Sequence, residues 1–155
     1  MAVFLLLAVF AAAAGATFEA GEWYYRDLTR PAWNAPVWLT ALGWSVAYAC
    51  AALAAWNAWQ SEHYDRLKAA AWWVALIALN VAWSFLYFGI NRPGWAWIAL
   101  GPAIVLAIIC LLRFRRLSPV AGVLMAPYLL WIAYLWLLNL ATWTLNGGLF
   151  SKVLL

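Results

Sequence analysis

The sequence predicts an all-α integral membrane protein, in which residues 1–155 form one domain of five transmembrane helices with a structured loop between the first two. The composition is 70% hydrophobic and only 9% charged, whereas soluble proteins carry about 25% charged residues. The charged residues fall in short clusters, and the uncharged segments between them are each long enough for the roughly 20 residues that a spanning helix needs. The apolar runs are continuous rather than alternating, which disfavours a membrane β-barrel.

The first two helices are expected at about residues 2–18 and 38–60. The first segment has the small residues of a cleaved signal peptide but no basic start, so we interpret it as a helix that the protein keeps. In the second segment, alanines repeat at intervals of three and four residues and predict a stripe of close helix packing: Ala47, Ala51, Ala55 and Ala58. Trp44 lies roughly 9 Å inside this helix, which is deep for an indole of the interfacial belt.

Residues 19–37 are predicted to form a folded lid over one end of the bundle. Pro31 and Pro36 prevent one continuous helix here, because proline lacks an N–H and restricts the residue before it. The segment is nevertheless rich in tryptophan and tyrosine, whose rings favour a place that is apolar on one side and wet on the other. An exposed ion pair of Arg26 or Arg30 with a neighbouring carboxylate is worth only about 0–1 kcal/mol. We therefore expect burial of the rings to dock the lid.

Three more helices are expected at about residues 68–90, 94–113 and 118–146. Glycine and proline end the first of them, and an asparagine followed by glycines ends the last. The helix at 68–90 carries a second stripe of small residues, Ala71, Ala75, Ala78 and Ala82. We expect this stripe to pack closely against another helix, either within the bundle or across a homodimer.

The sequence leaves the orientation and the identity of the membrane open. One side of the membrane would carry Arg66, Lys68, Arg113, Arg115 and Arg116, and the other side would carry Arg26, Arg30, Arg92 and Lys152. Cytoplasmic loops carry an excess of lysine and arginine, so five basic residues against four weakly favour a cytoplasmic location for the first side. The membrane would be that of a bacterial envelope or of an organelle. The net charge of +4 is spread over the loops, so the sequence predicts no clustered basic surface that would bind nucleic acid.

The charge pattern and the residue types exclude several functions. No charged residue lies inside a predicted helix core, which argues against a pump or an ion-coupled transporter. We find no metal-binding spacing, no nucleophile with its base and no phosphate-binding loop, so neither a metal site nor an ordinary acid–base enzyme is predicted. His63, the only histidine, is expected to be a solvated interfacial residue rather than a haem or metal ligand.

Indoles and amides from three helices are predicted to lie at a similar depth beneath the lid. Measured from the lid side, Trp44, Trp83, Asn139 and Asn80 lie roughly 9 to 15 Å inside their helices. An apolar cavity with a few placed polar groups is the usual form of a small-molecule site, and we expect the lid to contact Trp44. The same side chains could serve packing between helices, and spacing alone slightly favours packing.

Several stretches of the chain form a specific combination: WYYRDLTRPAWNAP at 23–36, WSVAY at 44–48, NVAWSFLYFG at 80–89, PYLLW at 127–131, LN at 138–139 and WTLN at 143–146. In this order they resemble the tryptophan-rich sensory protein or translocator protein family, also called the peripheral benzodiazepine receptor family. The resemblance covers nearly the whole chain.

The resemblance implies a five-helix bundle, often dimeric, with a ligand cavity that opens toward the lid. Ligands of the family are porphyrins such as protoporphyrin IX, haem, sterols and synthetic drugs. No cofactor would be required, since porphyrin or haem would be the ligand, and the partners would be these molecules, the lipid bilayer and a second copy of the chain. Some bacterial members resemble light-dependent porphyrin-degrading catalysts, which makes Trp44 and Trp83 candidate catalytic residues.

Carried over by motif, the expected ligand site draws on the lid and on three helices. Its residues are Trp23, Tyr24, Trp33, Trp44, Tyr48, Asn80, Trp83, Ser84, Tyr87, Leu135, Asn139 and Trp143.

The chain departs from the family pattern in the lid and in the last helix. Ala35-Pro36 stands where the family usually has two prolines, which would loosen the lid. Leu135 and Trp136 stand where small residues are usual, and this bulk is expected to narrow the cavity. The stretch LNLATWTLN lacks the tyrosine and the basic residue of the weak sterol motif.

The sequence thus predicts a membrane receptor or carrier that binds porphyrins, and also sterol-like ligands, in a cavity capped by the first loop. Two alternatives stay open: a light-dependent porphyrin-degrading enzyme that uses the cavity tryptophans, and a regulatory membrane protein without transport.

Overall fold

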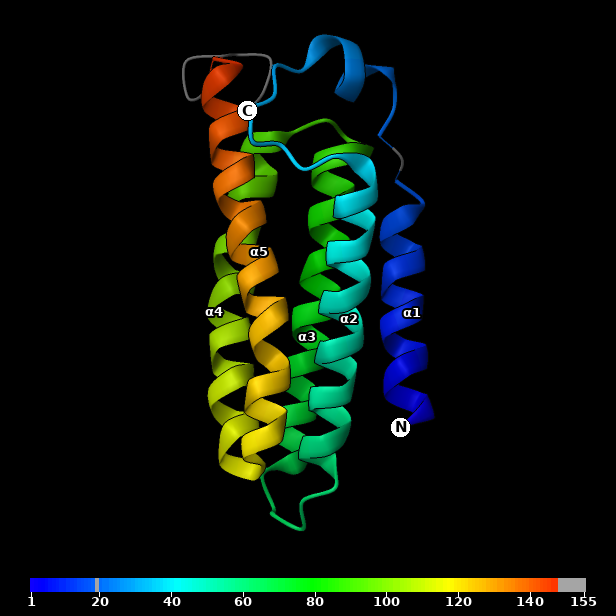
Figure 1. Ribbon diagram of the computed structural model, residues 1–155, viewed down its shortest axis with the longest axis vertical. Coiled ribbons are helices and arrows are strands. Elements are labelled where there is room, and N and C mark those ends of the chain that lie inside the picture. Colours follow the sequence, from blue (N-terminus) through cyan, green and yellow to red (C-terminus); the bar gives the residue numbers. More distant parts are fainter. Residues whose placement is uncertain (19, 148–155) are drawn as a thin grey trace.

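The computed structural model describes residues 1–18 and 20–147. These residues form five α-helices and two short π-helical segments, and none of them is in a strand. The order is α1 (Ala2–Ala16), η1 (Trp23–Asp27), α2 (Val37–Trp59), α3 (Arg66–Ser84), η2 (Phe85–Gly89), α4 (Pro93–Leu117) and α5 (Pro119–Leu145), shown in Figure 1. The prediction of an all-helical protein is confirmed.

Four of the helices are long and apolar enough to span a membrane: α2, α3 together with η2, α4 and α5. Helix α1 is equally apolar but has only 15 residues, which is about 22 Å of helix against a hydrocarbon core of about 30 Å. It ends at Ala16, two residues before the predicted end at 18.

Helix α3 gives way to η2 after Ser84, and α4 continues to Leu117 instead of ending at 113. The arginine-rich stretch contains no helix breaker, so the helical hydrogen bonds continue through it. The helix stops at Ser118, whose backbone is extended (φ −157°, ψ 125°). A residue before a proline prefers this conformation, and Pro119 begins the next helix.

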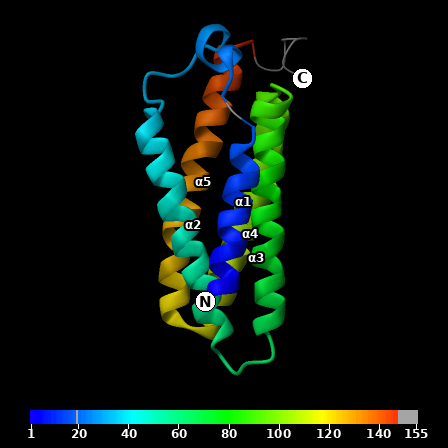
Figure 2. The same cartoon turned by 90° about the vertical axis from the view of Figure 1, so that its right-hand side faces the viewer.

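The helices run lengthwise, with the lid at one end of the bundle and the loop between α2 and α3 at the other (Figure 1). Helices α4 and α5 lie side by side. Helix α1 stands at the margin, over the junction of α2 and α3 (Figure 2). The site described below depends on this marginal position of α1.

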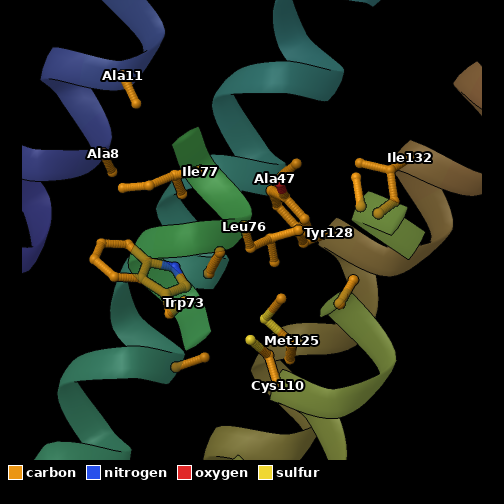
Figure 3. Close-up of a cluster of buried hydrophobic side chains, with 14 of the residues drawn as sticks. Ala8, Ala11, Ala47, Trp73, Leu76, Ile77, Cys110, Met125, Tyr128 and Ile132 are labelled. Carbon is orange, nitrogen blue, oxygen red and sulfur yellow. The ribbon is translucent and has the colours of Figure 1, made fainter. Parts of the chain in front are cut away.

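The core combines small residues of α2 with large residues of α3 and α5. All four alanines of the predicted α2 stripe are buried, as close helix packing requires. Around them lie Trp73, Leu76, Met125 and Tyr128, none of which is measurably exposed (Figure 3).

The alanine stripe of α3 faces away from this core. Ala71, Ala75, Ala78 and Ala82 are all exposed, because α3 directs its bulky residues Trp73, Leu76 and Trp83 inward. Packing of this stripe within the bundle, one of the two possibilities raised by the sequence, is therefore wrong for the described residues.

Candidate ligand-binding site

Side chains of α5 and of the residue that follows it hold the lid at two places. Asn146, directly after α5, accepts a hydrogen bond from the Thr29 backbone N–H at 2.9 Å and donates to the Thr29 carbonyl at 2.8 Å. The Tyr134 hydroxyl accepts from the Ala35 N–H at 2.9 Å and donates to the Trp33 carbonyl at 3.4 Å. The extended part of the lid is thus fixed near both of its ends.

The charged residues of the lid make weaker contacts. Arg26 pairs with Glu22 at 3.2 Å, as the sequence predicted, but the two side chains are 72% and 78% exposed. Arg30 lies over the rings of Tyr24 and Tyr25, at 4.9 and 5.7 Å from their centroids. An exposed ion pair contributes little to stability, so the aromatic and backbone contacts hold the lid.

A continuous series of ring contacts runs beneath the lid, and we call it the aromatic arc. It passes from Trp33 through Tyr134, Trp131, Trp44, Trp83 and Tyr87 to Trp23, with successive ring centroids 5.2 to 6.2 Å apart. These separations are those of interacting aromatic pairs. The lid supplies both ends of the arc, and the ring contacts of Trp44 are with Tyr48, Trp83 and Trp131. By ring contacts the lid is linked to Trp44 through Tyr87 and Trp83 on one side and through Tyr134 and Trp131 on the other.

Gly43 makes the centre of the arc possible. A Cβ atom at this position would lie only 2.4 Å from the ring of Trp131. The absence of a side chain on this face of α2 lets the indole of α5 approach the helix backbone, next to Trp44.

Trp44 and Tyr48 also form the wall of a cavity between α1 and α2. The larger part of the cavity has a volume of about 510 Å³, within the range of about 300–1,000 Å³ usual for ligand pockets. The residues of α1 that bound it are apolar, and most of them are alanines. A second part of about 280 Å³ shares Ala12, Ala16, Trp44 and Tyr48 with the first and extends to Trp83 and Ser84. The two parts share an aromatic wall, and most of their lining is apolar.

Several buried polar atoms in this region have no hydrogen-bond partner among the described residues. They include Nε1 of Trp83 and of Trp131, Oδ1 of Asn80 and Nδ2 of Asn139. The Asn80 amide is only half satisfied, since its Nδ2 donates to the hydroxyl of Tyr128. An unpaired buried polar atom costs about 1–3 kcal/mol, so a polar group of a ligand that reached one of them would gain a hydrogen bond.

The structure brings part of the expected ligand site together. Trp44, Tyr48, Trp83 and Ser84 line the cavity. Trp23 and Tyr24 contact the ring of Tyr87, which in turn contacts Trp83. Trp33 lies at the opposite end of the arc, beside Tyr134, in a separate groove along α5.

The remaining expected residues lie deeper or elsewhere. Asn80, Leu135 and Asn139 are buried in the core. Trp143 is buried and stacks on Trp97 of α4, with centroids 5.6 Å apart. Trp136 stacks on the same ring at 5.4 Å.

Sequence reasoning missed two components of the site. The first is the α1 wall, whose small residues Ala12, Gly15 and Ala16 predict close packing but here border a cavity. The second is the pair Trp131 and Tyr134, which completes the arc. Gly43, beside Trp44, was the sequence feature that could have predicted the contact with Trp131, because glycine within a helix often marks a close approach of another group.

His63 lies outside this site. It is exposed in the loop between α2 and α3 and stacks on Tyr64 at 4.4 Å. Among the described residues, no three histidine, cysteine or acidic side chains come together in a group that could hold a metal ion.

Comparisons with known proteins agree with this architecture. A model of the TspO/MBR family matches residues 2–144. Protein CrtK of Rhodobacter capsulatus is 28% identical over 149 residues, which cover 95% of this chain and 92% of that protein. The tryptophan-rich sensory protein of Cereibacter sphaeroides is 33% identical over 135 residues, with 87% and 84% covered. The translocator protein of Ovis aries is 30% identical over 139 residues, with 86% and 82% covered. With its apolar spanning helices and this match along most of its length, the chain is an integral membrane protein that belongs to the TspO/MBR family.

Proposed function

We propose that this protein is a membrane receptor or carrier for flat hydrophobic ligands of the porphyrin type, including protoporphyrin IX and haem. The observation that carries the proposal is the wall of three rings, Trp44, Tyr48 and Trp83, in one apolar cavity. A conjugated macrocycle stacks favourably on such rings. Sterols would use the alanine-rich wall that α1 contributes.

The names of the relatives support this class of function. They speak of translocation and of sensing, and both activities begin with a bound ligand. In this proposal the ligand is held between α1 and the rest of the bundle, and no resident cofactor is required.

The proposal also includes the finer membrane architecture. Helix α1 crosses the bilayer as the fifth span, since a short helix is accommodated by local thinning of the bilayer. Two copies of the chain associate through the exposed alanine stripe of α3. The membrane is that of a bacterial envelope or of an organelle.

Titration of the detergent-solubilised protein with protoporphyrin IX, followed by porphyrin fluorescence, tests the function. We expect saturable binding, weakened about tenfold by Trp44→Ala through loss of a stacking partner. Trp95→Ala is the matched control, because this indole is 52% exposed and lies on α4, outside the cavity. No saturable binding would refute the function, and equal losses in both variants would refute the site.

A second candidate is light-dependent porphyrin degradation, which the contact between Trp44 and Trp83 favours. Their ring centroids are 5.7 Å apart in the same cavity wall, so a bound macrocycle could touch two indoles at once. Illumination should then bleach the porphyrin absorbance faster with the protein than with free tryptophan, and Trp83→Phe should slow the bleaching. Saturable binding without accelerated bleaching would exclude the enzyme and retain the receptor function. No binding at all would favour a regulatory membrane protein without transport.

A further inference from the structure

The end of the bundle opposite the lid carries a polar pocket of about 250 Å³. It lies between the loop at 60–65 and the last turns of α4. Its lining residues are His63, Tyr64, Asp65, Ala69, Arg113, Arg116 and Leu117. Nothing in the proposed ligand site uses it.

The two arginines of this pocket lack an acidic partner. Arg113 and Arg116 are exposed, and no carboxylate among the described residues pairs with either of them. The other basic residues nearby are engaged: Arg66 lies over the Trp59 ring at 5.3 Å, and Lys68 is 3.8 Å from Asp65. The pocket therefore contains two guanidinium groups that are free to bind an anion.

The spacing of the arginines places them on one face of α4. Residues three apart are neighbours on a helix surface, so Arg113 and Arg116 both reach the pocket. Arg115 is directed elsewhere: its Cβ would lie 2.6 Å from a Cβ added at Gly122, so it packs against α5. The same helical turn thus offers a matched control with the same charge outside the pocket.

The loop side of the pocket is compatible with an anion. The carboxylate of Asp65 already faces Lys68 and the ring of His63, both at 3.8 Å. His63 Nδ1 accepts the Asp65 backbone N–H at 3.1 Å, which leaves Nε2 as the nitrogen of the ring that can donate. Tyr64 is 80% exposed and adds an aromatic ring with a polar edge beside the arginines.

The position of the pocket indicates where the anion comes from. Helices α3 and α4 are both long and apolar enough to span a membrane. The pocket lies where α3 begins and α4 ends, and the ends of spanning helices lie at the depth of lipid headgroups. Basic pockets between spanning helices bind such headgroups, and the guanidinium fork matches the geometry of phosphate oxygens.

We propose that this pocket binds the phosphate of an anionic phospholipid, with Arg113 and Arg116 donating to the phosphate oxygens. The acyl chains then lie along the apolar surface next to Leu117. The proposal does not depend on the porphyrin site at the other end of the bundle.

Native mass spectrometry of the full chain in mild detergent, titrated with phosphatidylglycerol or phosphatidylcholine, tests the proposal. We expect the wild type to bind phosphatidylglycerol about tenfold more tightly than phosphatidylcholine. The double variant Arg113→Gln/Arg116→Gln should lose this preference, whereas Arg115→Gln should keep it. If the double variant does not purify as a folded protein, the single variants Arg113→Gln and Arg116→Gln should each show a partial loss.

Two outcomes would overturn the proposal. Equal losses in Arg115→Gln and in the pocket variants would mean that the basic end attracts lipids only by its overall charge. Displacement of phosphatidylglycerol by millimolar inorganic phosphate, beyond the effect of sodium chloride at equal ionic strength, would mean that the pocket is a site for free phosphate.

Discussion

At the scale of single residues, the packing of α5 on α2 depends on Gly43. A methyl group here would collide with the Trp131 ring at 2.4 Å, and overpacking of this kind costs about 1–3 kcal/mol. We expect Gly43→Ala to lower the Tm in detergent and to shift the fluorescence of the aromatic arc.

Gly101 of α4 provides the control for this substitution. A Cβ added there meets nothing within 4 Å, and alanine is a better helix former than glycine by about 1 kcal/mol. Gly101→Ala should therefore leave the Tm unchanged or raise it. If both variants were equally stable, the close approach of Trp131 to α2 would be wrong.

The buried hydrogen bond between Asn80 and Tyr128 gives a second prediction at this scale. Both residues are buried, and the Asn80 amide is already unpaired at Oδ1. Tyr128→Phe removes the closer of the two acceptors of Asn80 Nδ2 and leaves only the Leu76 carbonyl at 3.5 Å, which should cost about 1–3 kcal/mol and lower the Tm. Tyr64→Phe, at an 80% exposed ring, should have no such effect. An unchanged Tm in Tyr128→Phe would show that the amide finds another partner.

At the scale of elements, the lid is held by rings and backbone rather than by charges. Trp33 packs on Tyr134 with centroids 5.9 Å apart, while the Arg26–Glu22 pair is exposed. We therefore expect Trp33→Ala to raise the off-rate of a bound ligand more than Arg26→Ala does. Stopped-flow release of protoporphyrin IX and of a neutral ligand separates this effect from direct pairing of Arg26 with a carboxylate. Wild-type off-rates for Trp33→Ala with both ligands would show that the loop is not a lid.

The sequence predicts where helices lie along the chain far better than how they are rotated. Continuous apolar runs between charge clusters locate α2 to α5 to within a few residues. The rotation of α3 about its axis was not predictable, because its sequence alone does not determine whether the face with Ala75 or the face with Leu76 packs inward. The positions of the neighbouring helices decide this. The partners of the lid were missed for the same reason: the hydrogen bond from Ala35 to Tyr134 joins residues far apart in the sequence.

At the scale of the whole molecule, the exposed alanine stripe of α3 is the surface through which we propose that two copies associate. Small residues let helices approach closely in lipid, and Ala75 and Ala78 lie in the middle of the stripe. We expect Ala75→Leu or Ala78→Leu to weaken a dimer that survives mild detergent, as measured by light scattering. Val123→Leu on α5, at a side chain that is 73% exposed, should not weaken it. A monomeric wild type would leave the stripe facing lipid.

The two hydrogen bonds between Asn146 and Thr29 of the lid depend on a side chain that can deamidate as the protein ages. Asn146 precedes Gly147, whose φ of 97° suits a residue without a side chain. The Gly147 nitrogen makes only a long hydrogen bond of 3.3 Å to the Thr144 carbonyl, and its attack on the side-chain amide carbon of Asn146 would release ammonia and form a succinimide. Conversion of the Asn146 amide to a carboxylate removes the Nδ2 donor that binds the carbonyls of Thr29 and Thr142. A carboxylate oxygen would then face these carbonyl oxygens and repel them. Aged preparations should therefore contain a fraction that is heavier by about one dalton, and in that fraction the Thr29 amide should exchange with deuterium faster than in fresh protein.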